Sequence, residues 1–164
     1  MIETIIKIIG SIVGPVIGRL ARGRPQAEVI AKPIVGVRPY EYIHIQNLGP
    51  GSVLIQGVQA RPPGIYSIAR DHSPGAITRA QINIDTKVLL RPGETCDLPI
   101  VPLRDPAKVP EDAPPLLVRF VIYWRKTSAS RWPQIPVVIR TSTRDIKDIA
   151  AAAASQRPLP TART

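Results

Sequence analysis

The chain has 164 residues, about the length of one domain, and 22 Lys and Arg against 12 Asp and Glu give it a formal net charge of +10. Apolar residues make up 44% of it, too many for a disordered polyelectrolyte, and the single Cys96 excludes an internal disulfide framework. Its two histidines exclude a His-rich metal site, so we expect no metal and no other cofactor.

Residues 2–20 repeat apolar side chains at spacings of three and four, which predicts one face of an amphipathic helix. Small residues at steps of four form a second stripe, which would let two such helices approach closely within lipid. The apolar face carries Ile5, Ile6, Ile9, Ile12, Val13, Val16, Ile17 and Leu20, and the small stripe carries Gly10, Gly14 and Gly18.

The uncharged run in this segment, residues 8–18, is shorter than the roughly 20 residues that a membrane-spanning helix needs. Arg19, Arg22 and Arg24 follow it, as expected of a helix lying at an anionic lipid surface. Two alternatives stay open: the apolar face could pack on a neighbouring subunit, or the segment could be a secretory signal, although 20–24 is a poor cleavage site. We therefore predict residues 1–24 as a membrane or assembly anchor.

From residue 25 onward, prolines separate short segments with strand patterns. Period-two alternation and turn residues predict strands at 41–46, 52–58, 65–70, 76–84, 87–90, 95–100, 116–124 and 135–141. The turn cluster at 47–51 predicts that the first two form a hairpin. We expect a buried core that includes Val53, Ile55, Val118, Phe120 and Ile122. The proline-rich stretch 102–115 predicts a long crossover of the Greek-key kind.

Seven or eight short strands at a spacing of about 8–12 residues are typical of an antiparallel sandwich or barrel. Residues 27–141, with an Asn-x-Gly turn after residue 46 and an Arg-Pro-Gly-Glu turn at 91–94, resemble an immunoglobulin-like β-sandwich, without its Cys…Trp…Cys arrangement. The predicted fold is thus mainly β, an antiparallel sandwich of immunoglobulin-like or jelly-roll-like type over residues 25–141. Ser142 and Asp145 can cap a short C-terminal helix, so residues 142–164 are predicted as helix and tail.

No group of residues predicts catalysis. Asp71, His72 and Ser73 contain the residue types of a hydrolase triad, but contiguous side chains cannot converge on one point, and we interpret them as a polar turn. His44 should face outward on its strand, and Cys96 should serve as a small buried side chain. We expect a protein without hydrolase or nucleotide-dependent activity.

Both tryptophans flank one short polar loop that carries three cations. Trp beside Arg or Lys suits a lipid headgroup layer, a nucleic acid or a protein hot spot. The alternative is that Trp124 ends the core face and Trp132 plugs the end of the sandwich. We assign anionic-surface or partner binding to Trp124, Arg125, Lys126, Arg131 and Trp132, together with Arg19, Arg22 and Arg24.

These observations predict a non-enzymatic structural or interaction protein. Residues 1–24 would attach it to a membrane surface or to protein subunits of a larger assembly, as a homo-oligomer, and the sandwich would present a basic surface. One alternative is a virion structural protein, a capsid or minor capsid component. A second alternative, a nucleic-acid-binding accessory protein, is not favoured because the chain has no run of five or more cations.

Overall fold

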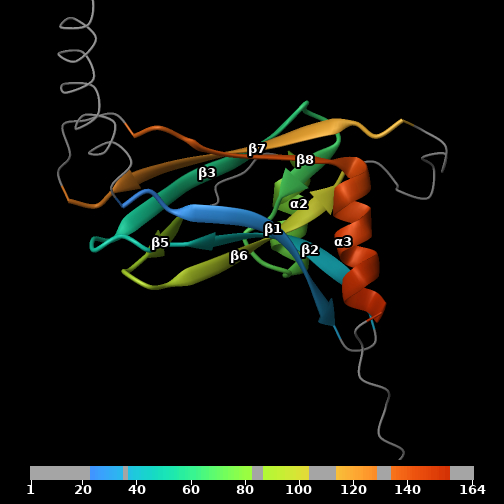
Figure 1. The fold of residues 1–164 in the computed structure, drawn as a ribbon, viewed down its shortest axis with the longest axis horizontal. Coiled ribbons are helices and arrows are strands. Elements are labelled where there is room, and N and C mark those ends of the chain that lie inside the picture. The colour runs from blue at the N-terminus through green and yellow to red at the C-terminus, as the bar shows by residue number, and fades with distance from the viewer. Residues whose placement is uncertain (1–22, 35–36, 83–86, 104–113, 129–133, 156–164) are drawn as a thin grey trace, which may run out of the picture.

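The computed structural model describes residues 23–34, 37–82, 87–103, 114–128 and 134–155. Over these ranges the chain forms two antiparallel sheets of four strands each and two helices (Figure 1). The helix predicted for residues 2–20 lies outside the described residues, as do Arg131 and Trp132. A mainly β architecture is therefore confirmed for the central part of the chain.

The two sheets draw their strands from alternating parts of the chain. The first sheet has the order β1 (Gln26–Ile34), β2 (Val37–Gln46), β6 (Thr95–Pro102) and β4 (Tyr66–Ile68). The second sheet has the order β5 (Val88–Leu90), β3 (Val53–Arg61), β7 (Leu117–Lys126) and β8 (Val137–Ser142). Only β1–β2 and β7–β8 are consecutive pairs, so every other connection crosses between the sheets.

The inward side chains of both sheets meet in one buried cluster, and this contact holds the sandwich together. All five residues predicted as core, Val53, Ile55, Val118, Phe120 and Ile122, are buried in it. The first sheet contributes a matching set on β2 and β6: Ile43, Ile45, Leu98 and Ile100. Because side chains alternate between the two faces of a strand, the residues between these positions project outward.

The strand predicted at 76–84 is wrong, because residues Pro74–Ile82 form helix α2. The Ser73 hydroxyl accepts the backbone N–H of Ala76 at 3.2 Å, which caps the helix, and Pro74 takes the first helical position, where a missing N–H costs nothing. Ala76 and Ala80, one turn apart, are buried. The Ser-Pro pair was the sequence signal for this helix start.

The predicted hairpin between residues 41–46 and 52–58 is also wrong, since β2 and β3 lie in different sheets. The connection is organised around the buried Asn47. Its amide donates to the carbonyls of Gly51 at 2.9 Å and Leu90 at 3.1 Å, and its side-chain oxygen accepts the Gly49 N–H at 3.0 Å. A buried amide satisfied on both sides directs the chain across to the second sheet.

The hairpin partner of β2 is β1, a strand that the proline spacing concealed. Pro33 lies inside β1, but at the irregularity between Lys32 and Ile34 where the regular pairing with β2 breaks. Proline is tolerated at such bulges because no ladder N–H is required there.

The C-terminal helix is confirmed as α3 (Thr143–Ser155). Asp145 accepts the backbone N–H of Ser142 at 3.0 Å, and the Ser142 hydroxyl accepts the backbone N–H of Asp145 at 3.1 Å, as in a capping box. Ile146, Ala150 and Ala153 are buried, and Ile146 joins the main core. In Figure 1, α3 lies at the end of the sandwich opposite to β5.

Candidate functional site

The end of the sandwich remote from α3 is formed by five segments that are distant in sequence, and we name it the loop end. Backbone hydrogen bonds join residue 47 to residues 93 and 94, and join residue 127 to residue 52. The loop end consists of residues 23–25, 47–52, 91–94, 126–128 and 134–136.

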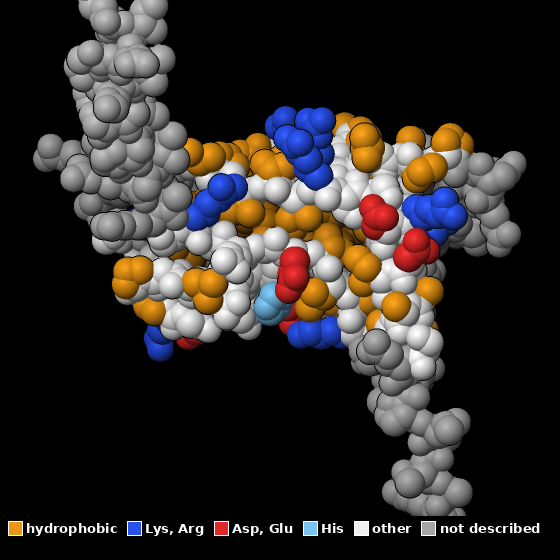
Figure 2. All heavy atoms as spheres, viewed as in Figure 1, with side chains coloured by type: hydrophobic (Ala, Val, Ile, Leu, Met, Phe, Trp, Pro, Cys, Tyr) orange, Lys and Arg blue, Asp and Glu red, His pale blue; other side chains and the backbone are white. Residues whose placement is uncertain are grey.

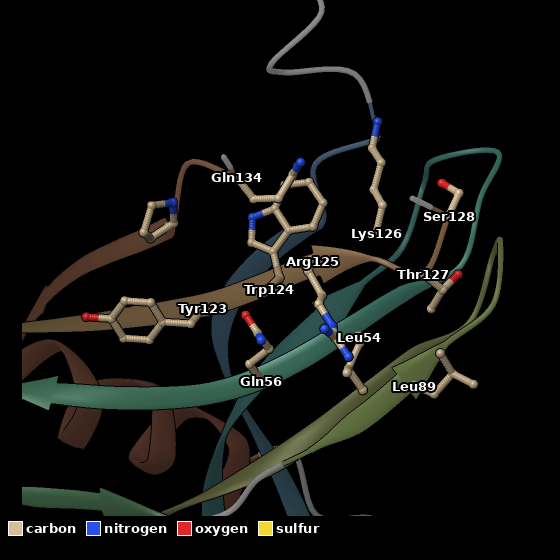
Figure 3. Close-up of a pocket in the computed structure, with 11 residues that line it drawn as sticks. Leu54, Gln56, Leu89, Tyr123, Trp124, Arg125, Lys126, Thr127, Ser128 and Gln134 are labelled. Atoms are coloured by element: carbon tan, nitrogen blue, oxygen red, sulfur yellow. The ribbon is translucent and has the colours of Figure 1, made fainter. Parts of the chain in front are cut away.

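A pocket of about 630 Å³ opens beside the loop end, over β3, β5 and β7 (Figure 3). Trp124, Arg125 and Lys126, the described part of the predicted tryptophan-flanked patch, all line it. Leu54, Leu89 and Tyr123 add apolar surface. The structure therefore brings the cations of this patch together with a mixed apolar and polar hollow.

Trp124 itself belongs to the core. Its side chain is 3% exposed, and its indole N–H donates to the carbonyl of Ile135 at 2.9 Å. Of the two roles weighed for this residue, the geometry favours the internal one, because the ring is covered by its own domain. Surface binding at this site consequently depends on the neighbouring cations.

Three cations of the predicted set, Arg24, Arg125 and Lys126, converge beside the loop end from two parts of the chain. The Arg24 guanidinium donates to the carbonyl of Pro136, a residue of the pocket wall, at 2.9 Å. Arg125 is exposed on β7, and the aliphatic end of Lys126 lies beside Gly23. Arg19 and Arg22 lie outside the described residues.

A close glycine contact brings the beginning of the described chain to this place. A Cβ on Gly49 would lie 2.6 Å from the Cα of Gly23, closer than any real contact. Gly23 also has a φ of 70°, a left-handed conformation that favours glycine. The chain that follows residue 22 therefore enters the sandwich against the loop 47–52.

Large apolar side chains accompany the cations. Leu48, Leu89 and Ile135 are 55%, 53% and 50% exposed. Sequence reasoning missed all three. The exposure of Leu48 could have been predicted from the sequence, because the side chain of an apolar residue inside a tight turn does not reach the core.

Asp71 and Ser73 are hydrogen-bonded to each other, whereas His72 contacts Tyr42. The Asp71 carboxylate accepts hydrogen bonds from the Ser73 hydroxyl and, at 2.8 Å, from the Ser73 backbone N–H, and both lower the pKa of Asp71. The His72 ring lies 2.7 Å from the Tyr42 hydroxyl. Ser73 caps α2. The three form a helix start rather than a converging constellation.

Cys96 packs against the core, and burial, followed by the charge of Asp97, raises its pKa to about 11. In the described part of the chain, no three His, Cys, Asp or Glu side chains are placed to hold a metal ion. In the same part, no helix has the length and apolarity needed to cross a membrane.

No family model matches this sequence, and a search of curated proteins finds no match to it.

Proposed function

We propose that the protein is a non-enzymatic attachment module whose loop end rests on an anionic membrane surface. Residues 1–24 would serve as the anchor, and the sandwich would project from the membrane. The observation that carries this proposal is the convergence of Gly23, the first described residue, with three cations and three half-exposed apolar side chains at one end of the described structure.

The convergence supports membrane attachment because each contribution alone is weak. A cation near an anionic leaflet contributes about 1 kcal/mol, and stable peripheral binding generally takes two signals that act together. Arg24, Arg125 and Lys126 supply the charge. Leu48 and Leu89 supply apolar surface that could enter the headgroup layer.

The strand order supports an immunoglobulin-like type of sandwich over a jelly roll. The order β1-β2-β6-β4 corresponds to the A-B-E-D sheet of that fold, and β3-β7-β8 corresponds to C-F-G. β5 pairs with β3 at the place of an added C′ strand, although here it follows β4 in the chain. Such sandwiches present loops at their ends, which suits a binding role for the loop end.

The test is co-flotation of the full chain with vesicles of phosphatidylcholine, with and without phosphatidylserine. The double variant Arg125→Gln, Lys126→Gln should bind the anionic vesicles about 30-fold more weakly, from about 1 kcal/mol per lost cation. The matched control is Arg144→Gln, Lys147→Gln, which removes the same charge from exposed positions on α3 at the opposite end. It should bind as the native chain does.

Equal binding by the two double variants would overturn the placement at the loop end. Equal binding to neutral and anionic vesicles would overturn the role of charge. If the native chain ignores vesicles and assembles into closed shells, the virion alternative replaces the membrane.

A further inference from the structure

A row of three arginines crosses the outer face of the second sheet. Arg61 on β3 is directly opposite Arg119 on β7, which is directly opposite Arg140 on β8. Directly opposed residues project to the same side of a sheet, and all three are exposed. The adjacent row, Ala60, Phe120 and Ile139, faces the core.

Nothing on this sheet balances the charge of the arginine row. The four strands of the second sheet contain five Lys or Arg and no Asp or Glu. Within the described residues, no carboxylate pairs with any of the three arginines; the ion pairs of Asp97 lie on the first sheet. Figure 2 shows Lys and Arg side chains gathered over β7 and β8. Like charges opposite one another destabilise a sheet, so the row costs stability that an anionic ligand would recover.

We propose that this face binds single-stranded nucleic acid, with the phosphates on the arginine row. Arginine forms paired hydrogen bonds with phosphate, which lysine does not, and the row consists of arginine alone. With strands about 4.8 Å apart, the row spans about 10 Å, enough to meet more than one phosphate of a nucleic acid strand.

The residues between the row and the loop end suit unpaired bases. Tyr123 is half-buried, and its hydroxyl lies 3.4 Å from the Arg61 guanidinium and 3.3 Å from the Gln59 amide oxygen. Tyr123 lies four residues beyond Arg119 on the same face of β7, about 13 Å away at 3.3 Å per residue. Its ring therefore lies beside the arginine row, where a base of the bound strand can stack on it. A set of phosphate-binding cations with an aromatic ring beside it is typical of single-strand binding.

The inference does not depend on membrane attachment, because the arginine row lies at the opposite end of β7 from the loop end. The probe is a fluorescent 20-nucleotide oligothymidylate, titrated against the full chain over a range of salt concentrations. The variant Arg61→Gln, Arg119→Gln, Arg140→Gln should bind it about tenfold or more weakly. When the logarithm of its affinity is plotted against the logarithm of the salt concentration, the slope should become shallower by about 0.7 for each lost phosphate contact. The matched control, Arg91→Gln, Arg144→Gln, Lys147→Gln, removes the same charge from exposed positions off this sheet and should bind as the native chain does.

A single substitution separates a binding role from a structural one. Arg119→Thr removes the central charge and introduces a good strand former, so its melting temperature should equal or exceed that of the native chain while oligothymidylate binding falls. A lower melting temperature with unchanged binding would overturn the proposal.

Four further results would overturn it. The first is a native chain that does not bind the oligonucleotide, and the second is a triple variant that binds as tightly as the control. The third is a polyglutamate peptide that binds as tightly as oligothymidylate, which would make an acidic protein the partner. Loss of vesicle flotation by the triple variant, with oligonucleotide binding intact, would assign the face to the membrane instead.

Discussion

Asp97 on β6 joins Lys32 and His44 on the outer face of the first sheet. Its carboxylate accepts a hydrogen bond from the Lys32 ammonium and lies 2.7 Å from the His44 ring nitrogen. Partial burial alone would raise the pKa of Asp97, but the hydrogen bonds and charges of Lys32 and His44 outweigh it and lower the pKa. The native state therefore favours the charged carboxylate, and His44 faces outward as its alternation predicts.

Asp97→Asn should lower the free energy of unfolding at about pH 7 by roughly 0.5–1 kcal/mol, the size expected of a partly exposed ion pair. Because the folded pKa lies below the unfolded value of about 3.9, this contribution is present above that value and is lost as the pH falls through the folded pKa. Urea unfolding at about pH 7 and about pH 2 measures the difference between the two chains. A difference that persists undiminished in acid would contradict the role of the charged carboxylate.

Gly49 is the second residue on which a local contact depends. Gly49→Ala should cost about 1–3 kcal/mol of unfolding free energy, because the new Cβ would meet the backbone of Gly23 rather than a flexible side chain. Gly51→Ala is its control, since a Cβ there meets nothing within 4 Å. Equal stability of the two variants in urea would show that Gly23 does not pack on residues 47–52.

At the scale of elements, β6 shows how a central strand accommodates proline. Residues 95–99 of β6 pair with β2, and residues 100–102 pair with β4 on the other side. Pro99 stands where one pairing ends and the other begins, so its missing N–H removes little from either ladder. β6 can thus connect β2 to β4 within one sheet despite its internal proline.

Helix α3 depends on its cap. Ser142→Ala removes the hydroxyl that accepts the Asp145 N–H and should lower the unfolding free energy by about 1 kcal/mol. Ser155→Ala, at the other end of the same helix, should be close to neutral because alanine has the higher helix propensity. Chemical denaturation of both variants gives the comparison, and equal losses would mean that the cap does not hold the helix on the sandwich.

At the scale of the whole molecule, the chain places different surfaces at different ends. The loop end gathers Gly23, the first described residue, with cations and exposed apolar groups, and α3 closes the other end. The arginine row crosses the outer face of the second sheet between them. If the protein attaches to a membrane through its loop end, the outer face of its second sheet would not lie against the membrane. Attachment and nucleic acid binding would then not compete for one surface.

Ile9→Asp, Ile12→Asp should release the protein from its membrane or assembly without lowering the melting temperature of the sandwich. The reason is that each buried Ile contributes about 1.5–3 kcal/mol, which an aspartate forfeits. Vesicle flotation and far-UV circular dichroism of the full chain measure the two effects separately. A double variant that stays attached would remove residues 2–20 as the anchor, and one that unfolds would make them part of the domain core. Gly14→Leu, which leaves the apolar face intact, tests helix pairing instead.

The sequence alone determined the elements that depend on interactions within a few residues. Alternation over 116–124 identified β7 and its buried face, and the Ser142–Asp145 spacing identified the start of α3, because periodicity and capping act within a few residues. Helix α2 was not predicted because its nine residues show little helical periodicity, and its Ser-Pro start was the only strong sequence signal. Composition assigned residues 124–126 and Arg24 to one binding role, but it did not predict that Leu48 lies exposed beside them.

Tertiary structure alone decided which strands are neighbours, and the candidate sites follow from that choice. Arg61, Arg119 and Arg140 form a row only because β3, β7 and β8 pair in one particular register, and register is set by how the buried faces of both sheets fit. Trp124 packs in the main core, and its indole N–H is satisfied by the carbonyl of Ile135, which tertiary structure brings back beside it. Such contacts join residues far apart in the chain, and their free energy depends on packing that no single segment contains.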